Sequence, residues 1–220
     1  MPYRLLKPAG LDRRDGKHPL LVFLHGIGER GTDNRVQLRH GRPLMKATAR
    51  DYRALVLVPQ CPPTATWAAR RWNDTNHALP DKPTEPLRLL VELIEQLKTR
   101  YPIDPARVHV MGLSMGGYGT WELIERYPDR FAAAMPVCGG GDESQAKRLT
   151  GLPIWAFHGS ADRLVPPIRS RGMIEAIRKA GGQPKYTQYE GVGHNSWDRA
   201  FAEPELLKWL FAQRRGQGNP

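Results

Sequence analysis

Short apolar runs, of the kind a parallel sheet buries on both faces, recur along this 220-residue chain. The clearest is Leu-Leu-Val-Phe-Leu at 20–24, inside a segment from His18 to Leu24 that stops at His25-Gly26. Uninterrupted apolar runs of this length are typical of central strands covered by helices on each side. The other predicted strands are Ala54 to Val58, Arg107 to Met111, Phe131 to Val137, Pro153 to Phe157 and, as a more polar outer strand, Lys185 to Tyr189.

Helical patterns fill the intervals between these runs. Thr84 is placed to cap the first of them and Pro86 is tolerated in its first turn. Its apolar residues follow i, i+3, i+4, i+7 spacing, at Leu87, Leu90, Val91, Ile94 and Leu97. Further helices are predicted from Ser114 towards Pro128, from Ile168 to Ala180 and around Leu206, Leu207, Leu210 and Phe211. This alternation predicts a single α/β domain over residues 1–220 with a mostly parallel sheet.

The chain is strongly basic, with 33 Lys and Arg against 22 Asp and Glu and a formal charge of +11. The excess is scattered in short clusters such as Arg13-Arg14, Arg70-Arg71 and Arg214-Arg215. This pattern favours a solvated Arg-rich surface over specific nucleic-acid binding, although the charge favours anionic surfaces or substrates. No segment approaches the ~18 to 20 apolar residues of a membrane span. The sequence does not indicate an oligomeric state.

The N-terminus has no apolar signal-peptide core, because residues 1–8 are short and polar. We therefore expect a cytoplasmic protein. A leader already removed would leave the same sequence, in which case the protein would be secreted or periplasmic.

The segment from Gln60 to Pro83 shows no periodicity but contains Trp67 and Trp72. Structureless segments of this length inside a domain are usually functional or disordered. Two interpretations stand side by side: the tryptophans form a wall of a binding site, where they stack on an aromatic or sugar group, or they pin the loop to the core.

The most informative motif is G-x-S-x-G at Gly112 to Gly116, with Ser114 at its centre. It follows a predicted strand and opens a predicted helix, which is the setting of a nucleophile elbow. A serine hydroxyl needs such exposure, and a neighbouring base, to act as a nucleophile.

An elbow of this kind requires an acid and then a histidine further along the chain, each after a later strand. Asp162 follows the strand that ends at Phe157, and His194 follows the strand that ends at Tyr189. We expect His194 to be the general base and Asp162 to orient it. The competing residues are placed less well. His109 and His158 are interpreted as structural, and His18, His40 and His77 lie too early in the chain. None of the acids Asp142, Glu143 and Asp198 combines a post-strand turn with the expected chain order.

Attack on an ester carbonyl creates an oxyanion, which needs hydrogen-bond donors already aimed at it. One expected donor is the backbone N–H of Met115, directly after the serine. The other is the N–H of Ile27, in the glycine-rich turn 25–28 after the early strand.

These stretches together resemble the α/β-hydrolase serine esterases, in the compact branch with feruloyl esterases, polyhydroxybutyrate-depolymerase-like enzymes and phospholipase/carboxylesterases or predicted peptidases. The resemblance is carried by residues 19–34 (PLLVFLHGIGERGTDN), 58–62 (VPQCP), 103–119 (IDPARVHVMGLSMGGYG), 157–166 (FHGSADRLVP) and 191–197 (GVGHNSW). It implies the triad Ser114, Asp162 and His194, oxyanion donors at Ile27 and Met115, and no metal or organic cofactor.

The chain departs from this family in two places. Family members usually begin with a further strand beside the segment Tyr3 to Lys7, so either the chain is trimmed or the sheet is smaller at that edge. The segment between Gly139 and Leu152 is short, so we expect no large lid and an open site that favours short or bulky esters.

The family's strand order also bears on Cys61 and Cys138. It places two strands between those that end near these residues, or roughly 14 Å at ~4.8 Å per strand. A disulfide needs Cα atoms within ~7 Å, so two free thiols are expected.

The function expected from these residues is hydrolysis of a small-molecule carboxylic ester, of the short-chain or aryl (feruloyl-like) type, through an acyl-serine intermediate. Two alternatives remain open: a serine peptidase, and a non-catalytic binding protein on a hydrolase scaffold.

Overall fold

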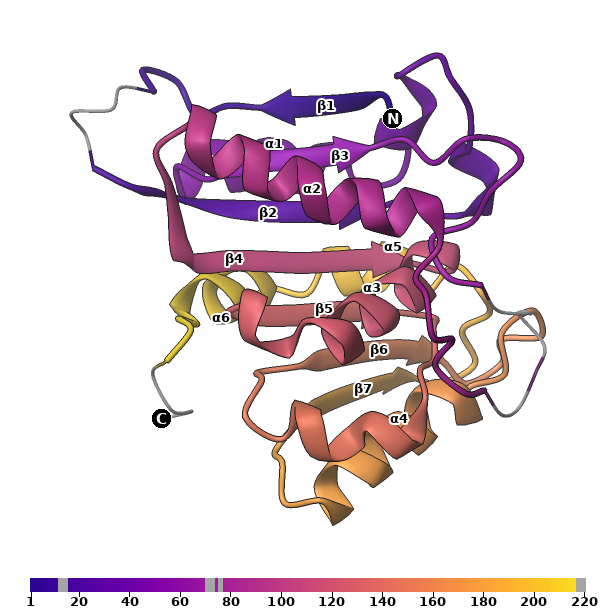
Figure 1. Cartoon of the computed structure of the whole chain (residues 1–220). Helices are drawn as coiled ribbons and strands as arrows, with labels where there is room; N and C mark the ends of the chain where they lie inside the picture. Colours follow the sequence, from indigo (N-terminus) through magenta and orange to yellow (C-terminus); the bar gives the residue numbers. More distant parts are fainter. Residues whose placement is uncertain (12–15, 70–73, 75–76, 217–220) are drawn as a thin grey trace.

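A computed structural model of the chain describes residues 1–11, 16–69, 74 and 77–216, and a seven-stranded sheet forms its centre (Figure 1). The strand order is β1-β3-β2-β4-β5-β6-β7. Strand β1 is antiparallel to β3, and the other pairs are parallel, which confirms the predicted sheet. The strands are β1 (Tyr3–Leu6), β2 (His18–Leu24), β3 (Leu55–Pro59), β4 (Ile103–Leu113), β5 (Ala133–Val137), β6 (Trp155–Gly159) and β7 (Lys185–Tyr189).

Helices cover both faces of this sheet. On one face lie α2 (Glu85–Arg100), α3 (Met115–Arg126) and α4 (Ile168–Lys179). On the other face lie α1 (Arg42–Asp51), α5 (Trp197–Phe201) and α6 (Leu206–Ala212). The described residues also form short 3₁₀ helices: η2 (Ile27–Glu29), η3 (Val36–Leu38), η4 (Pro128–Arg130) and η5 (Glu143–Leu149).

The run at 20–24 shows why a sheet with two covered faces requires continuous apolar sequence. Successive side chains of a strand point to opposite faces. Leu20 and Val22 accordingly belong to the cluster under α2, α3 and α4, whereas Leu21 and Phe23 pack under α1, α5 and α6. All of them are fully buried, so both faces of β2 contribute to the free energy of folding.

Strands β2 to β7 agree with the sequence prediction except at their ends. Strand β1 lies in the segment Tyr3 to Lys7, which only the family resemblance indicated, and two helices were not predicted. Strand β4 begins at Ile103 rather than at Arg107, because Ile103 already pairs with His18. Helix α1 was missed because only Leu44, Met45, Thr48 and Ala49 are buried on it, in an otherwise polar sequence. Helix α5 has five residues, too few to show a period.

The two cysteines lie where the strand order predicts. Strands β2 and β4 separate β3, which precedes Cys61, from β5, which precedes Cys138. Both cysteines are buried and free, so the prediction of two thiols is confirmed.

Thr84 links α2 to the long segment that precedes it. Its Oγ1 accepts a hydrogen bond from the Leu87 N–H (3.3 Å) and donates one to the Trp67 carbonyl (2.7 Å). The cap expected from the sequence is therefore present, and it also fastens Trp67 to the helix start.

We expect Thr84→Ala to lower the free energy of unfolding by about 1 to 2 kcal/mol, because it removes both the helix cap and the bond to Trp67. Urea unfolding followed by circular dichroism measures the change. Thr84→Ser, which keeps the hydroxyl, serves as the control and should recover most of the loss. Equal stability of Thr84→Ala and wild type would contradict the assigned role.

Candidate active site

The serine of the G-x-S-x-G motif sits in a strained turn between β4 and α3. Ser114 has φ 54° and ψ −116°, a backbone conformation that side-chain-bearing residues rarely adopt. Neighbouring backbone packs tightly around it: a Cβ on Gly116 would overlap the Leu24 carbonyl, and one on Gly112 would overlap the Gly116 carbonyl. The Ser114 N–H donates to the Val137 carbonyl at 2.9 Å. The two glycines are therefore required for the approach of α3 to the sheet.

Ser114, His194 and Asp162 form one hydrogen-bonded line. Ser114 Oγ lies 2.8 Å from His194 Nε2, and His194 Nδ1 lies 2.7 Å from Asp162 Oδ2. The three residues follow β4, β6 and β7, whose carboxyl ends meet at one edge of the sheet because these strands are parallel. Asp162 is buried, whereas 18% of the His194 side chain is exposed.

Asp162 is held in its ionised form. Burial alone would raise the pKa of this carboxyl, but hydrogen bonds from His158, His194 and the Val165 N–H outweigh it and hold the pKa well below its usual range. The Leu164 N–H adds a bond of 2.9 Å to Oδ1. Asp162 thus presents a fixed negative charge to Nδ1 of His194.

His158 is fully buried beside the acid, in agreement with its interpretation as a structural histidine. Its Nε2 lies 3.0 Å from the Val165 carbonyl and 3.3 Å from Asp162 Oδ2, and its Nδ1 lies 2.7 Å from Ser170 Oγ. The side chain thus ties the loop that carries Asp162 to α4. The sequence placed it near the acid but gave no sign of this contact.

The loop that carries His194 is fastened by residues that the sequence analysis did not single out. Cys138 Sγ donates to the His194 carbonyl at 3.1 Å and lies 2.7 Å from Ser196 Oγ. The Trp197 ring meets the His194 ring edge-on, with centroids 5.3 Å apart. Cys138, like Ser114, has a positive φ (49°). Its position directly after a buried strand is the only sequence signal that could have indicated this role.

The glycine turn after β2 lies against the elbow. A Cβ on Gly26 would lie 2.8 Å from Leu113 Cδ1 and 3.7 Å from Ser114 Cβ. Ile27 begins η2 and Met115 begins α3, and no hydrogen bond within the described residues uses the N–H of either. The two N–H groups expected to bind an oxyanion are therefore unengaged.

His25 holds this turn in place and was not recognised from the sequence. Its Nε2 accepts the Cys61 N–H at 2.9 Å, which leaves the proton on Nδ1 to donate to the Gly26 carbonyl at 2.7 Å. Burial lowers the pKa of His25 to about 4. The histidine that follows β2 directly, in the pair His25-Gly26, is the signal that could have identified it.

Trp67, for which the sequence left open a place in the wall of a binding site or a pin to the core, is fully buried. Its Nε1–H donates to the His25 carbonyl at 3.1 Å, and the two rings meet edge-on at 5.3 Å. The substrate-contact prediction is wrong for Trp67, since its indole packs in the core. The alternative interpretation, that this residue fastens the loop to the core, agrees with the structure. Trp72 lies outside the described residues.

Cys138, Asp162 and His194 place a sulfur, an oxygen and a nitrogen within 4.8 Å of one another, a spacing that a metal ion could use. Metal binding requires a thiolate. Burial raises the pKa of Cys138 to about 12, and Asp162 and His194 are bonded to each other. The group is therefore a hydrogen-bonded cluster and a poor metal site.

Comparison with known proteins finds similarity to a family of phospholipases and carboxylesterases and to a solved esterase. The sequence model of the phospholipase/carboxylesterase family matches residues 11–205. The structure superposes on that of a thermostable esterase with a TM-score of 0.88 and 41% identity, over 97% of this chain and 59% of that one.

Curated relatives match shorter stretches. Poly(3-hydroxybutyrate) depolymerase of Ralstonia pickettii is 31% identical over 121 residues, which are 54% of this chain and 24% of that enzyme. The bifunctional acetylxylan esterase/xylanase XynS20E of Neocallimastix patriciarum is 28% identical over 95 residues, which are 43% of this chain and 14% of that enzyme. The chain thus spans less than a quarter of these relatives. Within the part of the chain that the structure describes, no helix is long and apolar enough to cross a membrane.

The lowered pKa of His25 predicts a pH-dependent stability. In the unfolded chain His25 takes up a proton below about pH 6.5, whereas in the folded protein it stays neutral down to about pH 4. The unfolded state therefore binds more protons in this window, so the free energy of unfolding decreases as the pH is lowered. This residue accounts for a decrease of about 2 kcal/mol between pH 7 and pH 5. Urea unfolding at both pH values measures the change. The neutral variant His25→Gln should lose correspondingly less, and equal losses in both proteins would contradict this origin.

Proposed function

Because the chain belongs to the phospholipase/carboxylesterase family of α/β-hydrolases, we propose that it hydrolyses carboxylic esters, with Ser114 as nucleophile, His194 as general base and Asp162 as its orienting acid. The observation that carries this proposal is the line of hydrogen bonds from Ser114 Oγ to Asp162, at 2.8 and 2.7 Å. Both distances lie within the range that proton transfer requires.

In the first half of the reaction His194 Nε2 takes the proton of Ser114 as Oγ attacks the carbonyl carbon. The imidazolium that forms is stabilised by the Asp162 carboxylate, which also keeps the proton of Nδ1 directed away from the serine. The carbonyl oxygen becomes an oxyanion, for which the free N–H groups of Ile27 and Met115 are the proposed donors. His194 then returns the proton to the departing alcohol, and an acyl-serine remains.

In the second half water replaces the alcohol. His194 takes a proton from the water, whose oxygen attacks the acyl carbonyl. As the bond from the acyl carbon to Ser114 Oγ breaks, His194 returns this proton to Oγ, and the carboxylic acid leaves.

We further propose that the substrates are short-chain or aryl (feruloyl-like) esters. The connection between β5 and β6 is short and contains only η5 among its described elements, which supports an open approach to Ser114. The relatives named for poly(3-hydroxybutyrate) and acetylxylan also act on esters with small acyl groups.

We expect Ser114→Ala to reduce kcat for p-nitrophenyl acetate by a factor on the order of 10⁴ or more, because no nucleophile remains. A spectrophotometric assay of nitrophenol release measures this. Ser144→Ala, at an exposed serine of η5, is the matched control and should keep wild-type kcat. Unchanged turnover in Ser114→Ala would exclude the mechanism.

The substrate proposal predicts a ranking of kcat/KM. Nitrophenyl esters of two to four acyl carbons and methyl ferulate should be cleaved faster than esters of twelve or more carbons and faster than a peptide anilide. A preference for the anilide would support the peptidase alternative. Absence of turnover on every one of these compounds would support the non-catalytic alternative.

A further inference from the structure

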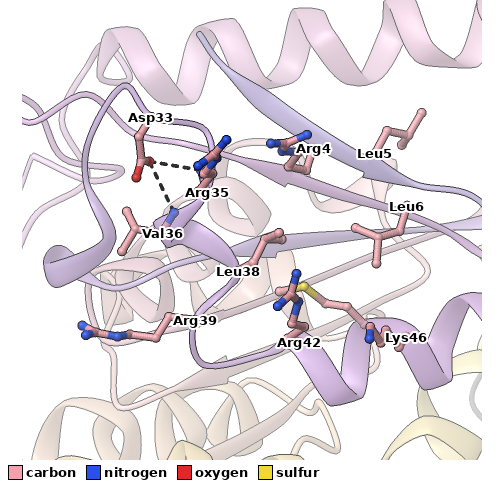
Figure 2. A pocket seen from close by; sticks show the side chains of 11 residues that line it. Arg4, Leu5, Leu6, Asp33, Arg35, Val36, Leu38, Arg39, Arg42 and Lys46 are labelled. Atoms are coloured by element: carbon pink, nitrogen blue, oxygen red, sulfur yellow. Dashed lines mark hydrogen bonds between the residues drawn. The ribbon is translucent and has the colours of Figure 1, made fainter.

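The strongest feature outside the active site is a hollow between β1, η3 and the first turns of α1, with a volume of about 800 Å³. Five cationic side chains line it: Arg4, Arg35, Arg39, Arg42 and Lys46. Figure 2 shows the guanidinium groups of Arg4, Arg35 and Arg42 around aliphatic side chains of β1 and η3, among them Leu6 and Leu38.

The hollow continues along the same two elements. A second hollow of about 390 Å³ shares Leu6 and Lys46 with the first and adds the cations Lys7, Arg50 and Arg53. The two hollows adjoin each other along β1 and α1, and we call them together the basic groove. It runs beside β1, at the opposite end of the strand order from β6 and β7, which precede Asp162 and His194.

Few carboxylates of the protein neutralise these cations. Asp33 is the one acid that lines the basic groove. Its Oδ1 accepts bonds from Gln60 Nε2 at 2.8 Å and from the N–H groups of Arg35 and Val36 at 3.0 and 3.3 Å. Within the described chain Arg35, Arg39, Arg42 and Lys46 form no ion pair with a carboxylate. Arg50 pairs with Asp51, so the positive charge that the protein leaves uncompensated in the groove is concentrated on Arg39, Arg42 and Lys46.

The lining restricts the chemistry of the ligand. A single anionic headgroup would neutralise only one or two of the cations, so a ligand that fits the whole cleft carries charges repeated along its length. The lining residues include no aromatic side chain, so unpaired nucleic-acid bases would find nothing to stack on. The floor is aliphatic, with Leu6, Leu38 and Met45, and suits the C–H faces of sugar rings.

We propose that the basic groove binds a linear acidic polysaccharide, whose carboxylates pair with the Arg and Lys side chains while its sugar rings lie on the aliphatic floor. Arginine is suited to this role because its guanidinium pairs with a carboxylate through two parallel hydrogen bonds. This site goes beyond ester hydrolysis and does not require it.

The test measures binding of a fluorescently labelled decamer of α-galacturonate by anisotropy at low salt. The full-length protein should bind it and should not bind a labelled neutral dextran of equal length. The triple variant Arg39→Gln/Arg42→Gln/Lys46→Gln should bind roughly tenfold more weakly or worse, since each exposed ion pair contributes a factor of up to about five. Increasing salt should weaken the wild type more than this variant.

The matched control is Lys147→Gln/Lys179→Gln/Lys208→Gln, which also removes three positive charges but at exposed sites outside the groove. It should bind like wild type, and equal weakening in both variants would overturn the proposal, as would absence of binding to the wild type. Tighter binding of a DNA duplex than of the decamer, lost in the groove variant, would overturn the assignment to polysaccharide. Both triple variants should keep wild-type turnover of p-nitrophenyl acetate, so a failure here is distinct from a failure of the esterase proposal.

Discussion

The close approach of two backbones, at the end of β2 and at the start of α3, is the constraint on which the site depends. Glycine at 116 lets the helix reach the Leu24 carbonyl, and glycine at 26 lets the following turn lie against Leu113 and Ser114. Any larger residue at 116 would push the helix outward and separate the serine from the turn. The contact of Gly116 with the Leu24 backbone thus positions both the strained Ser114 and the N–H groups proposed to face its substrate.

Around this contact, buried polar groups serve mainly to hold loops in place. His25 joins the turn after β2 to Cys61, His158 joins the Asp162 loop to α4, and Cys138 joins the end of β5 to the His194 loop. Each bond connects segments distant in sequence and lies in the interior, where an unpaired polar group is costly. The three loops of the site therefore depend on these neighbouring segments as well as on the strands that precede them.

The sequence was informative where a property is local and periodic. Apolar runs and helical spacing predicted the sheet and four helices, and the elbow pattern with its downstream acid and histidine selected three residues that the structure brings into hydrogen-bond contact. It failed where the property depends on packing between distant segments. The burial of Trp67 under His25 and the bond of Cys138 to the His194 carbonyl have no local pattern, and the basic groove joins residues of β1 and α1 that are about 40 positions apart.

Because His194 follows the outermost strand, the proposed active site can come apart while most of the chain stays folded. Strand β7 pairs with β6 alone, and its side chains are only partly buried, whereas the strand that precedes Ser114 is enclosed by neighbours on both sides. Sheet margins open locally at lower free energy than sheet interiors. Partial unfolding there would remove the proposed base, His194, while the serine, its turn and most of the core stay in place, so the site would come apart before the molecule unfolds as a whole.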